Sequence, residues 1–112
     1  MKLITAIVKP FKLDEIRQAI TDIGIQGVTV TEVHGYGQSP GRIESYRGAD
    51  YRIDFLPKAK IEVAVDDSIA EQVIEALCNV ARTGAPSDGK VWVLELGQAL
   101  RIRTGELGPD AI

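Results

Sequence analysis

The fold is decided by a strand and a helix that lie in the stretch LITAIVKPFKLDEIRQAITDIG, residues 3–24. Residues 3–8 form a continuous apolar and β-branched run, which is typical of a strand that is buried on both faces. From Leu13 onward the apolar residues recur at helical spacing, and Gly24 follows where a helix end favours a left-handed residue. This stretch therefore predicts a strand followed by an amphipathic helix.

The rest of the chain repeats this order of elements. β-Branched or alternating runs predict further strands at residues 28–37, 58–65 and 90–96, with a short fifth strand at 99–103. A second helix is predicted between Ser68, which with Glu71 has the spacing of a capping box, and Gly84. The order β-α-β-β-α-β over one domain, residues 1–112, predicts an α+β fold of the ferredoxin-like sandwich type.

The predicted sheet has two faces, and its two helices can cover only one of them. The first and fourth strands, residues 3–8 and 90–96, are apolar on both faces, so the second face also needs to be hidden from water. Another copy of the same chain is the simplest cover. We therefore expect a homo-oligomer.

The composition excludes several classes of function. The 112 residues carry a net charge of −3, which argues against a nucleic-acid binder that neutralises many phosphates. Cys78 is the only cysteine and His34 the only histidine, which excludes a disulfide within the chain, a Cys-rich zinc site and a His-based metal cluster. No apolar run approaches the roughly 20 residues of a membrane span. We expect a cytoplasmic protein that is not an enzyme and does not insert into a membrane.

The connection between the second and third predicted strands, about residues 37–56, is longer than a compact domain usually needs. It lacks a regular apolar period and has few large aliphatic residues to anchor it, so we expect a mobile arm. It also carries Tyr46 and Tyr51, for which packing gives no reason. The arm is therefore a candidate docking or modification site.

The connection TGAPSDGK at residues 83–90 is a candidate phosphate-binding loop. Its glycines let backbone N–H groups approach an anion, and Lys90 supplies a positive charge. The alternative is an ordinary turn between a helix and a strand, which also favours proline, aspartate and glycine.

A pair of arginines near the C-terminus supports an anion site. Arg101 and Arg103 would project from the same face of a strand, where two guanidinium groups repel unless an anion lies between them. The alternative for this pair is a salt bridge with Glu106 or Asp110.

Other notable residues have ordinary structural explanations. Cys78 lies beside the apolar stripe of the second helix, which favours a place in the core. Trp92 is interpreted as a packing residue or an interface anchor. Asp66 and Asp67 are interpreted as negative charge at a helix N-terminus.

Five stretches of the chain, KPFKLDEIRQAI, GVTVTEVHGYG, YRGADYRIDFLPKAKIEV, DGKVWV and RIRTGE, resemble in order and spacing the PII nitrogen-regulatory signal-transduction proteins. The resemblance covers essentially the whole chain. It implies a homotrimer of ferredoxin-like subunits that binds ATP or ADP, with Mg²⁺ accompanying ATP, in the clefts between neighbours. It also implies a long T-loop that regulates nitrogen metabolism through targets such as nitrogen-assimilation enzymes or an ammonium transporter, which would recruit the protein to the membrane.

The resemblance also assigns roles to individual positions. Nucleotide-binding positions lie at the base of the T-loop (about 37–56), in the B-loop (about 83–90), near the adenine, and in the C-terminal segment (about 99–112) of the adjacent subunit. They are Gly37 and Gln38 at the base of the T-loop, and Ser87, Asp88, Gly89 and Lys90 in the B-loop. Thr29, Glu62 and Ala64 lie near the adenine, and Arg101 and Arg103 belong to the C-terminal segment. Lys58 matches a lysine that contacts 2-oxoglutarate, and Tyr51 occupies the place of a uridylylated tyrosine.

Two departures from the family pattern bear on the ligands. Gln38-Ser39 stands where typical members have a basic residue and then a glutamine, which helps to coordinate the magnesium through which 2-oxoglutarate binds. Serine has a shorter reach, so we expect a weak response to 2-oxoglutarate. Ala85-Pro86-Ser87 stands where a basic residue, an aliphatic residue and a glycine are usual, so we expect weaker nucleotide binding or an altered preference between ATP and ADP.

Three alternatives remain. The first is a specialised paralogue that senses nucleotide or another small metabolite, with a weak 2-oxoglutarate response and a different partner. The second is a small phosphatase on the same sandwich, for which the sequence supplies no evident nucleophile or base. The third is a single-stranded RNA module, which needs exposed aromatic residues on the sheet that the two Phe and one Trp do not provide.

Overall fold

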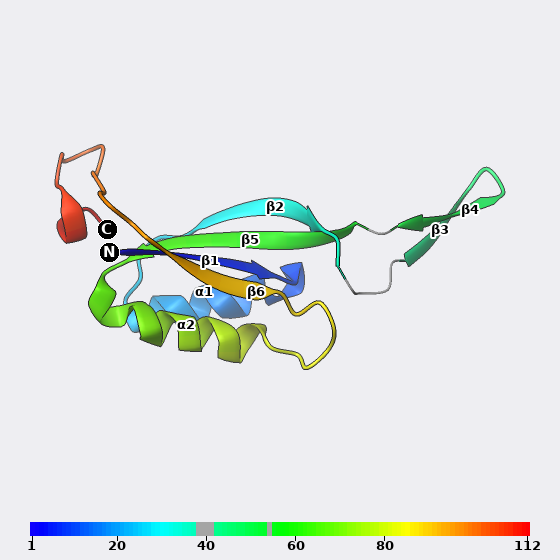
Figure 1. The fold of residues 1–112 in the computed structure, drawn as a ribbon, viewed down its shortest axis with the longest axis horizontal. Coiled ribbons are helices and arrows are strands. Elements are labelled where there is room, and N and C mark those ends of the chain that lie inside the picture. The colour runs from blue at the N-terminus through cyan, green and yellow to red at the C-terminus, as the bar shows by residue number, and fades with distance from the viewer. Residues whose placement is uncertain (38–41, 54) are drawn as a thin grey trace.

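The computed structural model describes residues 1–37, 42–53 and 55–112 of the chain (Figure 1). Its strands are β1 (Lys2–Val8), β2 (Thr29–Gly35), β3 (Arg42–Tyr46), β4 (Ala49–Ile53), β5 (Leu56–Val65) and β6 (Lys90–Glu95). Its helices are α1 (Leu13–Ile23) and α2 (Asp67–Ala81), with the short 3-10 helices η1 (Pro10–Lys12) and η2 (Gly108–Ala111). The described part contains no helix that is long and apolar enough to cross a membrane.

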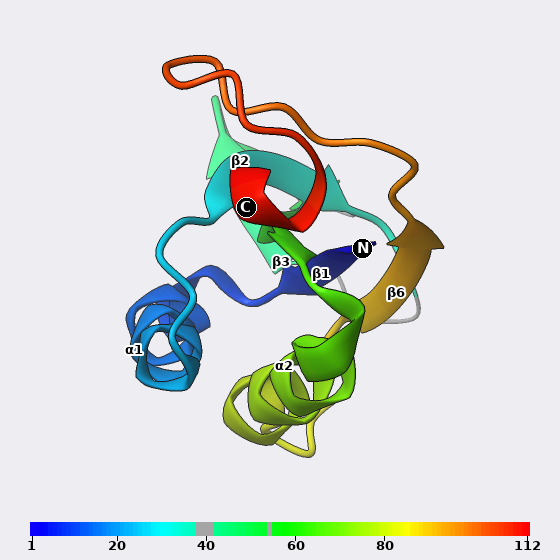
Figure 2. The ribbon, with the colours of Figure 1, turned by 90° about the vertical axis from the view of Figure 1, so that its left-hand side faces the viewer.

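Four of the strands form one antiparallel sheet in the order β2-β5-β1-β6. Both α1 and α2 lie on one side of this sheet (Figure 2), and we call the other side the open face. The order of elements is β-α-β-β-α-β, with the hairpin of β3 and β4 inserted between β2 and β5. The arrangement confirms the predicted α+β, ferredoxin-like fold.

The core lies between the sheet and the two helices. Alternate residues of the central strands β1 and β5 point toward the helices, as the two-residue period of a strand requires. The largest fully buried side chains are Ile4, Val8, Ile61 and Val65 from the strands and Ile16, Ile20, Val73 and Leu77 from the helices. Each such side chain contributes on the order of 2 kcal/mol to stability. This core holds both helices on one face, and no helix of the described part covers the open face.

The ends of the helices follow from the local sequence. α1 is closed by Gly24, which has the predicted left-handed backbone with a φ of 105°. α2 begins earlier than the capping box predicted from Ser68: its N-cap is Asp66, whose carboxylate accepts a hydrogen bond from the Ser68 N–H at 3.1 Å. The prediction of a capping box is wrong because the Asp66 carboxylate accepts hydrogen bonds from both the N–H and the hydroxyl of Ser68. The interpretation of Asp66 and Asp67 as charge at a helix N-terminus is confirmed.

The predicted arm contains regular structure that its sequence did not indicate. β3 and β4 pair in antiparallel register from Arg42 opposite Ile53 to Tyr46 opposite Ala49. Arg47 and Gly48 connect them with φ values of 51° and 78°, and positive φ at both positions suits a tight hairpin turn. The sequence therefore missed this hairpin at residues 42–53, and the expected mobility of the arm stays a prediction. The hairpin projects from one end of the sheet (Figure 1), and the longest extent of the molecule is 58 Å.

The predicted fifth strand at residues 99–103 is also wrong. Only an isolated bridge forms there, between Leu100 and Leu107, and the chain turns between them. The carbonyl oxygen of Arg101 accepts a hydrogen bond from the Gly105 N–H at 2.8 Å, which closes this turn. Arg101 and Arg103 therefore do not project from one face of a strand.

Candidate functional site

A cleft with a volume of about 650 Å³ opens at one end of the sheet. The end of β2 and the starts of β5 and β6 meet there with the segment that joins α2 to β6, which we call the α2–β6 turn (residues 82–89). The cleft is lined by Ile7, Gly35, Tyr36, Gly37, Leu56, Lys58, Pro86, Ser87, Asp88, Gly89, Lys90 and Trp92. The structure thus brings together three groups that the sequence assigned to ligands: Gly37, Lys58 and the residues from Ser87 to Lys90.

Lys58 is the buried cation of this cleft, with only 9% of its surface exposed. Its Nζ donates a hydrogen bond to the carbonyl oxygen of Ser87, which ties β5 to the α2–β6 turn. Burial lowers the pKa of Lys58 below its ordinary value, and the Lys9 ammonium lowers it further, while Asp88 acts in the opposite direction. Gly35 leaves room for the side chain, because a Cβ there would lie 3.2 Å from Lys58 Cγ. An anion that enters the cleft meets a poorly solvated positive charge.

Asp88 closes the α2–β6 turn on itself. Its carboxylate accepts hydrogen bonds from the N–H groups of Thr83 and Gly84 at 2.8 and 2.9 Å, and from the Thr83 hydroxyl. Lys9 Nζ lies 3.2 Å from the same carboxylate. The bonds from Thr83 hold the pKa of the Asp88 carboxyl far below its usual range, so this group stays ionised. Its oxygen atoms are therefore occupied inside the protein.

Two neighbours of Asp88 have left-handed backbone conformations. Gly89 has a φ of 103°, and a Cβ at this position would lie only 1.6 Å from the carbonyl oxygen of Ile7. The turn can therefore lie against β1 only because residue 89 is a glycine. Ser87 has a φ of 66°, which is a strained conformation for a residue with a side chain.

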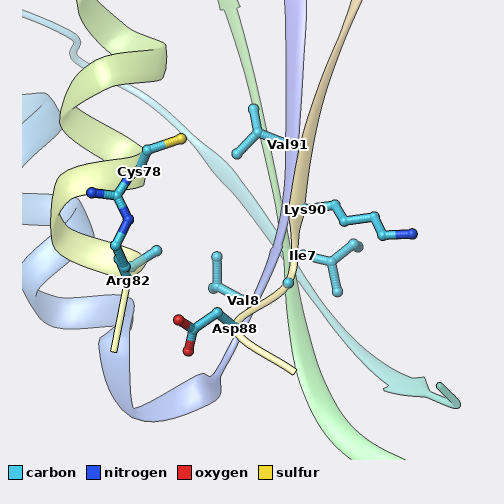
Figure 3. A pocket seen from close by; sticks show the side chains of 9 residues that line it. Ile7, Val8, Cys78, Arg82, Asp88, Lys90 and Val91 are labelled. Carbon is cyan, nitrogen blue, oxygen red and sulfur yellow. The ribbon is translucent and has the colours of Figure 1, made fainter. Parts of the chain in front are cut away.

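The charged side chains at the start of β6 lie on different sides of the strand (Figure 3). Asp88 points toward the end of α2, whereas Lys90 points to the opposite side. Cys78, Arg82 and Val91, labelled in Figure 3, help to line a second, smaller cavity, whose volume is about 170 Å³. Cys78 is half-buried at its wall, so the prediction that it belongs to the core is only partly met.

The open face carries apolar side chains that a single chain does not cover. Trp92 is 43% exposed and Leu94 is 56% exposed. Trp92 is therefore not a core residue, and its interpretation as an interface anchor stays a prediction, as does the expected second copy on this face.

The positions assigned to the adenine lie on the open face, further along the sheet from the cleft. Thr29 on β2 stands directly opposite Glu62 on β5. Ala64 follows Glu62 by two residues on the same strand, so the two share a face. The strand register thus brings these three positions together.

The two arginines lie away from the cleft in the chain. They belong to the segment after β6, at the end of the sheet where the Leu96 N–H donates to the Met1 carbonyl oxygen at 3.1 Å (Figure 1). Arg101 Nη1 lies 3.7 Å from Glu106 Oε2, so the alternative explanation by a salt bridge holds for Arg101, while Arg103 is exposed. One chain alone does not bring them to the α2–β6 turn.

Some predicted positions lie beyond what the structure describes. Gln38 and Ser39 are outside the described residues. Tyr51 lies in β4, where its backbone stands opposite Glu44. Among the described residues, no group of three or more His, Cys, Asp or Glu side chains could hold a metal ion.

Sequence reasoning missed Lys9, and it placed Thr83 in the candidate loop without giving it a role; both residues contact Asp88. Lys9 Nζ also donates to the Thr83 hydroxyl at 3.3 Å. The one signal was the acidic residue itself, because a carboxylate in a candidate anion loop requires donors of its own. The residue spacing does not indicate that Lys9 would be a donor to Asp88.

Comparison with known proteins places this chain among regulators. The family model described as "Nitrogen regulatory protein P-II" matches residues 1–106. Proteins named "Nitrogen regulatory protein P-II" from Rhodospirillum rubrum and Rhizobium meliloti are 54% and 55% identical to it over 112 residues, which is 100% of each chain. A protein of the same name from Haemophilus influenzae is 54% identical over the same full length.

Proposed function

The chain belongs to the nitrogen regulatory protein P-II family, and we propose that it is a sensor that binds ATP or ADP in the cleft beside the α2–β6 turn. Its role is that of a signal-transduction regulator and not that of an enzyme. Nucleotide binding would then change what a target protein recognises, without any change to the nucleotide itself.

The observation that supports this proposal best is the meeting of Lys58, Lys90 and a glycine-containing turn in one cleft. A diphosphate or triphosphate carries several negative charges, and two ammonium groups with close backbone N–H groups match that charge and shape. Each charge-assisted hydrogen bond of this kind contributes about 1.5–3 kcal/mol. An uncharged ligand would gain little from such a site.

A second copy of the chain would complete the site. The exposed apolar side chains Trp92 and Leu94 on the open face give neighbouring copies a surface to bury. Arg101 and Arg103 lie far from the turn in their own chain, and we propose that they reach the phosphates bound by the adjacent subunit of a homotrimer. Thr29, Glu62 and Ala64 would contact the adenine. Mg²⁺, where it accompanies ATP, would then depend mainly on phosphate oxygens and water.

The hairpin arm is the proposed contact with target proteins. It projects from the end of the sheet that holds the cleft (Figure 1), so a ligand there lies beside its base. We propose nitrogen-assimilation enzymes or an ammonium transporter as targets, and Tyr51 as a modified residue. Action in the cytoplasm, with recruitment to the membrane by a transporter, would follow from those targets.

One alternative stays within the family. Ser39, in place of a glutamine, and Ser87, strained with a φ of 66° where glycine is usual, favour a specialised paralogue. Such a protein would sense nucleotide or another small metabolite, respond weakly to 2-oxoglutarate at Lys58, and serve a different partner.

Calorimetric titration with ATP, ADP and AMP tests the proposal. We expect heat of binding and thermal stabilisation with ATP or ADP. The absence of both effects with all three nucleotides would reject it. A second titration, with 2-oxoglutarate in the presence of Mg-ATP, separates the alternatives, because tight binding would reject the paralogue with a weak response.

A further inference from the structure

A carboxylate lies in the same turn that the proposed function assigns to phosphate. Left free beside the phosphates, the charge of Asp88 would repel them. The structure turns it away instead: Asp88 points toward the end of α2, on the side of β6 opposite to Lys90 (Figure 3). Lys90 and Asp88 therefore point in different directions, and interactions within the protein are needed to hold the Asp88 carboxylate away from the phosphates.

Two residues hold Asp88 in that direction: Lys9, outside the assigned site, and Thr83, which begins the candidate loop but has no ligand contact assigned to it. Thr83 donates its N–H at 2.8 Å and its hydroxyl to the carboxylate. Lys9, which follows β1, places its Nζ 3.2 Å from Asp88 Oδ1 and 3.3 Å from Thr83 Oγ1. The side chains of Lys9 and Asp88 are only 19% and 23% exposed, so the pair is partly shielded from water. Lys9 also balances the charge that Asp88 would otherwise leave uncompensated.

We infer that Lys9 and Thr83 are positioning residues for nucleotide binding, which act through Asp88 to hold the α2–β6 turn in its binding shape. This inference rests on the proposed function. Ser87 is anchored on one side of Asp88 by Lys58, and Gly89 on the other side lies against the backbone of Ile7. Asp88 is the charged anchor between them, so its loss changes both the shape and the charge of the turn.

The first test is Mg-ATP titration of the full chain by calorimetry, with the lysine varied. Lys9→Met is expected to weaken ATP binding about tenfold, and Lys9→Arg to restore it to within about threefold. The matched control is Lys12→Met, which removes the same charge from a lysine that pairs with Glu15 at 3.6 Å and does not contact the turn. Unchanged ATP affinity in Lys9→Met, or an equal loss in Lys12→Met, would overturn the inference.

The second test asks whether Lys9 acts through Asp88. We expect Asp88→Asn to weaken binding about tenfold, and the double variant with Lys9→Met to lose little more than either single variant. Additive losses, or tighter binding by Asp88→Asn because a negative charge is gone, would overturn the inference. Thr83→Val and Thr83→Ser give an independent pair: the valine is expected to weaken ATP binding and the serine to preserve it, and the inverse result counts against the role of Thr83.

The proposed function and this inference fail in different ways. If the unaltered protein binds no nucleotide, the proposed function is rejected. If it binds ATP and the variants of Lys9 and Thr83 bind equally well, only the inference is rejected. Thermal unfolding of each variant without ligand shows whether a loss of affinity comes from a loss of fold.

Discussion

Gly89→Ala is the most informative change to the α2–β6 turn. The added methyl group would lie 1.6 Å from the carbonyl oxygen of Ile7 and 2.8 Å from its carbonyl carbon, on a residue with a φ of 103°. Left-handed backbone destabilises a residue with a side chain by about 1–2 kcal/mol. The steric clash of the methyl group with the backbone of Ile7, which cannot move as a side chain would, destabilises the protein by about 1–3 kcal/mol more. We expect a total loss of about 2–5 kcal/mol, which lowers Tm by roughly 10–20 °C in a domain of this size.

Two other glycines separate the two causes. Gly84 has a φ of 84°, and a Cβ there would have no atom within 4 Å, so Gly84→Ala tests the backbone strain alone, with an expected loss of about 1–2 kcal/mol. Gly97 has neither a left-handed φ nor a close neighbour, so Gly97→Ala is expected to change stability by less than about 1 kcal/mol. Urea unfolding followed by circular dichroism measures all three at one protein concentration. Equal losses in Gly89→Ala and Gly84→Ala would refute the close approach of the turn to β1.

Further predictions concern single side chains. Ser87→Gly is expected to raise stability by about 0.5–1 kcal/mol in urea unfolding, since it removes a strained φ of 66°, and a loss of stability would contradict this. Asp66→Ala is expected to lower Tm by about 3–5 °C at pH 7, because it removes the N-cap of α2. Hydrogen bonds from Ser68 hold the pKa of Asp66 below its ordinary value. The stability that Asp66 contributes is therefore complete above the unfolded pKa of about 4 and is lost as pH falls through the folded pKa. The Tm values of the unaltered protein and the variant should converge in acid, and a difference that stays constant with pH would contradict the cap. Leu94→Asp, which places a charge on a side chain 56% exposed on the open face, is expected to reduce the mass of the assembly toward that of one chain in light scattering, and an unchanged mass would argue against an oligomer through this face.

The sequence predicts best those elements that a local apolar period defines. The run at residues 3–8 and the helical spacing after Leu13 correspond to β1 and α1, because the same side chains that form the pattern fill the core. The hairpin of β3 and β4 was not predicted, since positive φ at Arg47 and Gly48 shapes its turn and its sequence has no regular apolar period. The supposed strand after β6 failed for a related reason, because a turn closed between Arg101 and Gly105 replaces it.

The candidate site was predictable only in part. Glycine and lysine at 89–90 marked the α2–β6 turn because their chemistry is local to that segment. The contact of Lys9 with Asp88 depends on β1 ending beside the turn, which only the tertiary fold determines. The salt bridge of Arg101 with Glu106, at 3.7 Å, was one of two explanations that the sequence left open.

The central claim is that the turn of one subunit and the arginines of its neighbour bind the same phosphates. ATP titration of mixed assemblies tests it most directly, with Lys90→Ala in one chain and Arg101→Ala with Arg103→Ala in the other. Each variant alone should bind ATP weakly, because every site lacks one half. After the two are refolded together, some interfaces pair an intact turn with intact arginines, and we predict that a fraction of tight sites returns. If mixing restores no tight binding while the mixed assemblies form, the site lies within one chain and the account is contradicted.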